Sequence, residues 1–148
     1  MAFRKRNTYV ALDDLGVVLI LVAGNVSLLE RFERWEKLIL ESPVRLNFAV
    51  ITDLSDWSGV ISEDNIYSIV AWGDQVRAEH NVPPVDVRKL AWIGRAGAGL
   101  DQMISIVNRI PGDRGYHATT AQEAWQMVKP GVPMPAMVKK FFKKRTLF

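Results

Sequence analysis

The chain has 148 residues, of which 49% are hydrophobic and 24% are charged. This length predicts a single domain, and this composition supports a packed core and excludes global disorder. The absence of cysteine excludes disulfides, thiolate nucleophiles and Cys-ligated metal sites, and two histidines argue against a His-rich metal site. The longest apolar run has seven residues, whereas a membrane-spanning helix needs about 20. Because the N-terminal residues lack the apolar core of a signal peptide, we expect a cytoplasmic protein.

Positive charge is concentrated at the two ends of the chain. Of the 19 basic residues, three lie in residues 4–6 and five in residues 139–145. The remaining 11 basic residues lie in the body of the chain, together with all 16 acidic residues. The body of the chain therefore carries a charge of −5, although the formal net charge is +3. This distribution argues against a nucleic-acid-binding face within the fold, so no nucleic-acid partner is expected. The basic ends suit an anionic partner such as a membrane surface, or are simply solvated.

Strands and helices alternate along the hydrophobic pattern. The continuous apolar run from Val17 to Ala23 predicts a central strand that is buried on both faces. Ser27 and Thr120 each precede a Glu by three residues, which is the capping-box pattern at a helix start. Strands are expected over residues 7–12, 17–23, 46–51, 87–93 and 116–118, and helices after residues 27, 62, 99 and 120. Residues 52–59 are expected to form a polar loop.

This order of elements predicts one α/β domain. We expect a mixed, mostly parallel sheet of four or five strands, covered on both faces by the helices of right-handed crossovers. A four-residue turn joins the first two strands, so the first strand should be antiparallel or lie at an edge. The domain is expected to span residues 7–129, between a basic arm at residues 1–6 and a Pro-rich link with a basic tail at residues 130–148.

The C-terminal tail combines apolar and basic residues at helical spacing. Its apolar side contains Phe141 and Phe142, together with Met137 and Val138. Its basic side carries Lys139, Lys140, Lys143 and Lys144. This pattern is typical of a short amphipathic helix that suits an anionic membrane surface or a partner's groove. The alternative is that the phenylalanines dock on the domain itself or on a second copy of the chain.

A Gly-rich turn connects the strand expected at residues 87–93 to the next helix. Arg95, Gly97 and Gly99 lie where backbone amides and the helix dipole favour anions. The spacing differs from both the dinucleotide fingerprint and the P-loop. This turn therefore predicts an anion or small-ligand site or, more simply, close packing of the helix against the strand.

The polar segment after the strand at residues 46–51 contains a second set of candidate residues. Asp53, Asp56, Trp57 and Ser58 all lie within it. Of the five tryptophans, Trp57 is the one expected to be exposed, because it lies in a polar loop, and an exposed loop tryptophan is a common contact anchor. No Ser or Cys stands in a triad-like context with His80 or His117. We therefore expect no catalytic residues, no metal, no cofactor and no enzymatic activity.

Several segments together resemble the STAS-like superfamily, and its SpoIIAA-like branch in particular, which is related to bacterial anti-sigma-factor antagonists. The segments are the two N-terminal strands, Val26-Ser27 at a helix start, Val50 to Ser55 at a strand end, Lys89 to Gly94, and Tyr116 to Trp125 with its Glu123-Ala124. The resemblance covers about residues 7–129. It implies a non-catalytic regulatory domain that binds a protein partner.

The resemblance also implies a switch in the polar segment. In that family a Ser in an Asp-Ser-Ser-Gly-like turn is phosphorylated by an anti-sigma kinase. The corresponding segment here runs from Asp56 to Gly59, with Trp57 in place of the first Ser. Phosphate on Ser58 would add a charge of about −2 beside Asp53 and Asp56, which could eject a docked partner.

Three functions therefore remain open. The first is a protein-interaction module that uses residues 53–62 and the helix after them, with a homodimer as one form of it. The second is a carrier that binds a small apolar or anionic ligand between helices near residues 94–99. The third is peripheral membrane attachment through the tail. A flat surface around Trp57 would favour the first, and an apolar cavity of roughly 300 Å³ or more would favour the second.

Overall fold

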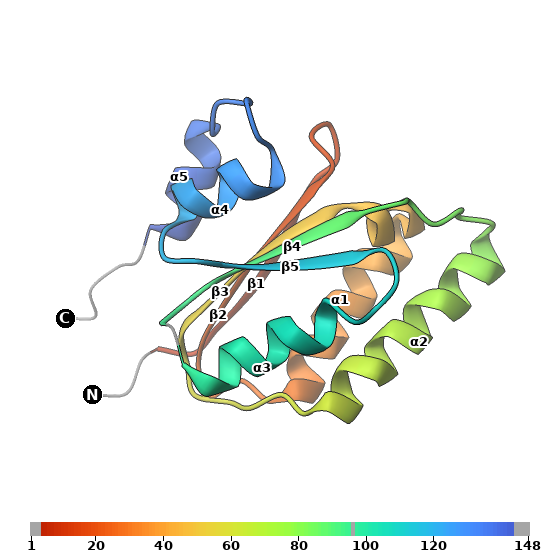
Figure 1. The fold of residues 1–148 in the computed structure, drawn as a ribbon, viewed down its shortest axis with the longest axis horizontal. Coiled ribbons are helices and arrows are strands. Elements are labelled where there is room, and N and C mark those ends of the chain that lie inside the picture. The colour runs from red at the N-terminus through yellow and green to blue at the C-terminus, as the bar shows by residue number, and fades with distance from the viewer. Residues whose placement is uncertain (1–3, 96, 144–148) are drawn as a thin grey trace.

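A five-stranded sheet organises the chain, as the computed structural model shows for residues 4–95 and 97–143 (Figure 1). In chain order the elements are β1 (Arg6–Leu12), β2 (Val17–Gly24), α1 (Leu28–Glu41), the 3-10 helix η1 (Pro43–Asn47), β3 (Ala49–Trp57), α2 (Glu63–His80), β4 (Arg88–Ile93), α3 (Ala98–Val107), β5 (Asp113–Ala118), α4 (Ala121–Val128) and α5 (Ala136–Phe142). The predicted α/β class is confirmed.

The strands lie in the sheet in the same order as in the chain. β1 pairs with β2 antiparallel, and β2 to β5 pair in parallel. β1 and β5 are the edge strands. The mixed, mostly parallel sheet and the antiparallel first strand are both as predicted.

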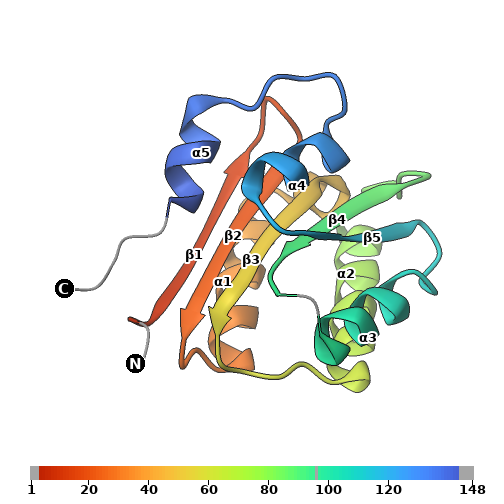
Figure 2. The ribbon, with the colours of Figure 1, turned by 60° about the vertical axis from the view of Figure 1, so that its left-hand side comes forward.

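The two faces of the sheet are covered by different parts of the chain. Each crossover from β2 to β5 moves one strand along in the same direction, so right-handed connections place α1, α2 and α3 on one face. The helices α4 and α5, which follow the last strand, cover the other face (Figures 1 and 2). The expectation of helices on both faces is confirmed, but the expectation that crossovers cover both faces is wrong. A sheet that grows in only one direction has all its crossovers on one side.

β2 is the centre of the core. All eight of its residues are buried, and its side chains alternate between the two faces. Val18, Ile20 and Val22 pack in the cluster beneath α1 to α3, whereas Val17 and Leu19 pack in the cluster beneath α4 and α5. The apolar run that predicts a doubly covered strand therefore serves two cores.

β3 begins and ends later than predicted. Leu46 and Asn47 belong to η1, and the strand continues through the expected polar loop to Trp57, which is paired with Gly24 of β2. Thr52 and Asp53 are buried although they are polar. Pairing with β2 and β4 on both sides satisfies the backbone here, and this tertiary context overrides the low strand propensity of Asp and Ser.

The predicted capping boxes at the helix starts are confirmed in part. Ser27 and Glu30 form the complete capping box of α1, whereas Thr120 accepts the backbone N–H of Glu123 without the return bond to its own backbone. Ser62 forms a capping box with Asn65, an amide partner that the sequence pattern does not single out.

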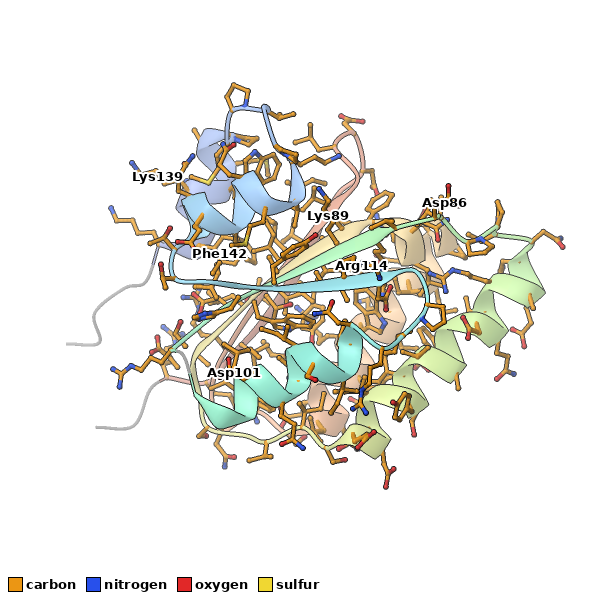
Figure 3. The ribbon with its side chains drawn as sticks, in the orientation of Figure 1. Asp86, Lys89, Asp101, Arg114, Lys139 and Phe142 are labelled. Atoms are coloured by element: carbon orange, nitrogen blue, oxygen red, sulfur yellow. The ribbon has the colours of Figure 1, made fainter. Side chains whose placement is uncertain are left out.

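The tail helix α5 is docked on the domain. Val138 and Phe142 are buried in the cluster beneath α4 and α5, whereas Met137 is 52% exposed. Figure 3 shows Phe142 on the inner side of α5 and Lys139 on its outer side. Of the predicted tail contacts, Lys144 lies outside the described residues.

Candidate ligand cavity

A cavity of about 450 Å³ lies between the sheet and the helices α1, α2 and α3. Its floor is formed by side chains from β2, β3 and β4 that point to this face, among them Ile20, Val50 and Leu90. Ligand pockets commonly have volumes of roughly 300–1,000 Å³ and mainly apolar walls. The volume is therefore large enough for a small organic molecule.

The backbone of α2 lies closest to η1 and α3, and Ile66 of this helix belongs to the same buried cluster as Val50 and Leu90 of the sheet. Gly73 allows the close approach to η1, since a Cβ there would lie 3.3 Å from Leu46 Cδ2. An edge-to-face contact between Phe32 and Trp72, with ring centroids 5.2 Å apart, joins α2 to α1. These contacts hold α2 at its outer position and leave the space beneath it.

The walls of the cavity are mostly aliphatic and aromatic. Three of the five tryptophans line it, one each from α1, α2 and β4: Trp35, Trp72 and Trp92. The other apolar wall residues on the helices include Leu28, Phe32, Ile66, Ile69, Val70, Met103 and Val107. Such walls favour an apolar ligand, because every apolar surface that the ligand covers is removed from water.

Arg31 is the most unusual polar group in the cavity lining. Its Nε and Nη1 atoms are buried and have no hydrogen-bond partner among the described residues. Its Cζ atom lies 4.6 Å from the ring centroid of Trp57, a cation–π arrangement. Tyr9 lies beside it, and burial raises the pKa of the Tyr9 hydroxyl despite the opposing effect of Arg31. This end of the cavity therefore has a positive charge with two unused donors.

The charges elsewhere in the cavity lining are paired. Arg88 Nε and Nη2 each donate to a carboxylate oxygen of Asp113 at 3.2 Å, and Arg88 Nη1 donates to the Leu46 carbonyl. Both side chains are largely buried. With this pair neutralised, the charge of the lining comes from Arg31.

Trp57 is not the exposed contact residue that was expected. It is half-buried, packs against the core on the cavity side, and donates from Nε1 to the Val26 carbonyl at 2.9 Å. The prediction of exposure is wrong because Trp57 ends a strand and is not in a loop. Its role in the structure is to hold the guanidinium of Arg31.

The other predicted residues of this segment differ in burial. Asp53 is only 2% exposed and accepts from the Ser55 backbone N–H at 2.9 Å and the Ser55 hydroxyl at 2.7 Å. Asp56 is partly buried. Ser58 is exposed, and its hydroxyl donates to the Gly24 carbonyl at 3.1 Å. The four candidates therefore do not form one flat surface.

The Gly-rich turn is not part of the cavity. Arg95, Gly97 and Gly99 are exposed, and none of them lines the cavity. The ligand site expected near residues 94–99 is therefore separate from this cavity and stays a prediction. Helix α3 approaches the sheet closely at a different glycine: a Cβ on Gly115 of β5 would lie 3.4 Å from Ile104 Cγ2 and 3.5 Å from Val107 Cγ1.

Sequence reasoning missed Arg31 as a candidate. A charged residue beside the apolar stripe of Leu28, Phe32 and Trp35 is ordinarily expected on the solvent side of a helix. One signal was available, since Arg31 follows Leu28 by three residues and such residues share a helix face.

Two further features are absent from residues 4–95 and 97–143, namely a membrane-spanning helix and a metal-ligand cluster. No helix in these ranges combines the length and apolar character required to cross a bilayer. Nor do three or more carboxylate or imidazole side chains in them converge as metal ligands.

A comparison with protein-family models, with curated proteins and with solved structures finds no significant match. The resemblance to STAS-like proteins therefore stays a prediction, and the cavity has to be interpreted from its own geometry.

Proposed function

We propose that this protein binds a small, mainly apolar molecule in the cavity beneath α1 and α2, as a carrier or as a ligand-responsive domain. The observation that supports this proposal is the apolar cavity of about 450 Å³, which exceeds the size of roughly 300 Å³ expected of a carrier. It agrees with the second of the three predicted functions, with the ligand moved from the Gly-rich turn to the α1–α2 side.

Close packing is the normal state of a protein interior, so a cavity of this size is a feature that needs a reason. The opposite face of the same sheet is filled, with Trp125 and Val138 completely buried. The chain therefore has the means to pack a helix tightly on this sheet. The open space beneath α2 supports a role in binding.

The cavity also has a route to solvent. Two of its lining residues are exposed: Leu29 of α1, at 65%, and Ser68 of α2. The opening therefore lies between these two helices. We expect a ligand to enter at this opening.

Calorimetric titration with decanol tests the proposal. We expect saturable binding to the wild type, and a loss of affinity of at least about tenfold in Val70→Trp, whose indole would occupy the cavity. Val132→Trp is the matched control, since Val132 is exposed and lies outside the cavity lining. Absence of saturable binding to the wild type, or equal affinity in Val70→Trp, would contradict the proposal.

The protein-interaction module stays a second candidate because apolar side chains flank the opening. Leu29 is 65% exposed and Val60, next to the cavity residue Ile61, is 81% exposed. If these residues bind a second copy of the chain, sedimentation velocity should show a dimer that Val60→Asp dissociates. A monomer at all concentrations would remove the homodimer form of this candidate.

A further inference from the structure

We propose that the preferred ligand is an amphipathic carboxylate, with its anionic head at Arg31 and its alkyl chain among the apolar walls of the cavity. This inference rests on the proposed function and specifies the chemical class of the ligand. It is carried by the position and the unused hydrogen-bonding capacity of one side chain.

The guanidinium of Arg31 is held in place by the structure around it. Its Cζ lies 4.6 Å from the centroid of the Trp57 ring, and Trp57 is itself fixed by the hydrogen bond from its Nε1 to Val26. Stacking on an aromatic face restricts the guanidinium plane and leaves the N–H groups at its edge available. Arg31 is therefore oriented before any ligand arrives.

Two donors of this guanidinium are buried without an acceptor, namely Nε and Nη1. A buried unsatisfied donor is destabilising, and more so when the group is charged. A carboxylate accepts two parallel N–H bonds from a guanidinium in a planar, bidentate arrangement. Nε and Nη1 lie on different edges of the guanidinium, so a carboxylate placed on either edge would satisfy one of these two donors.

The acidic side chains close to Arg31 in sequence are engaged elsewhere or point outward. Glu30 accepts from Lys5 at 2.7 Å and completes the capping box with Ser27. Glu33 is exposed on the outer side of α1. Asp113, the one acidic residue in the cavity lining, is paired with Arg88. The charge complementarity of the cavity therefore favours an anion.

Tyr9, the neighbour of Arg31 on the sheet side, also favours a polar ligand head at this end of the cavity. Like any tyrosine, Tyr9 is protonated at neutral pH, and its hydroxyl lies in the cavity lining with Arg31, where it can donate to an oxygen of the ligand. The apolar walls begin directly beside this group, with Leu28 and Phe32 on the same helix as Arg31. A molecule with a charged head and a flexible apolar chain matches both parts of the site.

Paired titrations with decanoate and decanol test the inference, because the two molecules share an alkyl chain and differ in the charge of the head. We expect decanoate to bind the wild type at least about tenfold more tightly than decanol, which is the effect of gaining charge-assisted hydrogen bonds. In Arg31→Gln this ratio should fall to within about threefold, while the decanol affinity is retained.

Arg34→Gln is the matched control. It removes the same charge from the same helix, but Arg34 is exposed, donates to the Asn7 carbonyl, and does not line the cavity. The preference for decanoate should persist in this variant. Retained decanol binding shows that the cavity of Arg31→Gln is still formed, and Arg31→Lys, which keeps the charge without the planar fork, should show an intermediate ratio.

The outcomes separate the two proposals. Equal binding of decanoate and decanol to the wild type, or an unchanged ratio in Arg31→Gln, would overturn the inference and leave the apolar cavity function standing. Absence of binding of either compound to the wild type would overturn both.

Discussion

The two faces of the sheet are both covered by helices but are packed in different ways. Beneath α4 and α5, Trp125 and Val138 are completely buried, and Trp125 Nε1 is satisfied by the Val132 carbonyl at 2.9 Å. Beneath α1 and α2 three tryptophans line a cavity of about 450 Å³. The comparison shows a filled face and a face with a cavity, and we propose that the cavity is the space for a ligand.

The largest expected effect on stability comes from replacing a tryptophan, and it should differ between the two faces. Trp125→Ala should lower the free energy of unfolding by about 3–5 kcal/mol, because it leaves a hole in a filled core. Trp72→Ala should cost only about 1–2 kcal/mol, since Trp72 is half-buried and already faces open space. Urea denaturation measures both values. Equal costs would show that the two faces are packed alike.

The docking of α5 gives the next contrast. Val138→Asp should destabilise the protein by about 3 kcal/mol, because it buries an unpaired carboxylate. Met137→Asp, one residue earlier and exposed, should change stability by less than about 0.5 kcal/mol.

The same pair of variants bears on membrane attachment, which stays a prediction. The docked α5 uses Val138 and Phe142 inside the domain, so vesicle binding through this face would require it to detach. If Val138→Asp is as stable as the wild type, the tail helix is free and its apolar face is available for a membrane.

Substitutions that enlarge a side chain should also distinguish the two faces of the sheet. Val128→Trp introduces an indole into the filled core beneath α4, where overpacking typically costs about 1–3 kcal/mol. Val70→Trp should cost less than about 1 kcal/mol, because the cavity accepts the added atoms. Thermal unfolding followed by circular dichroism measures the two changes. A larger loss in Val70→Trp than in Val128→Trp would contradict the contrast.

The smallest expected effect lies outside both faces, in the turn between β1 and β2. Arg45 donates to both carboxylate oxygens of Asp13 at 2.9 Å and lowers the pKa of Asp13. This stabilisation is present above the pKa of the unfolded chain and is lost as pH falls through the lowered pKa of the folded state. Because Asp13 is exposed, Asp13→Asn should cost less than about 1 kcal/mol at neutral pH. The difference between wild type and variant should vanish in strong acid, and a difference that grows in acid would contradict this assignment.

The sheet could be predicted well because its signals are local. The unbroken apolar run of β2, the short turn before it and the Ser27 cap each act through neighbouring residues. The extension of β3 to Trp57 could not be predicted, because it depends on backbone pairing with Gly24, far away in the chain. Misplacing that strand end is also the reason that Trp57 was expected to be exposed.

The cavity could not be predicted from the sequence, because it depends on the position of α2 relative to the sheet and not on the residues that α2 contains. Ile66, Ile69 and Val70 form an apolar side whether the helix touches the sheet or is held away from it. The contacts that hold it away, of Gly73 with Leu46 and of Phe32 with Trp72, join distant segments of the chain. Arg31 was missed for a related reason, since its burial depends on Tyr9 and Trp57 from two different strands.

Isotope-filtered nuclear Overhauser measurements on the protein with bound decanol test the central contrast most directly. The predicted result is a set of contacts from the alkyl protons to the methyl groups of Ile20, Val50 and Leu90, on the face beneath α1 and α2. Contacts to Leu19 and Val138 beneath α5, or none to the first group, would show that the open face is not the binding site.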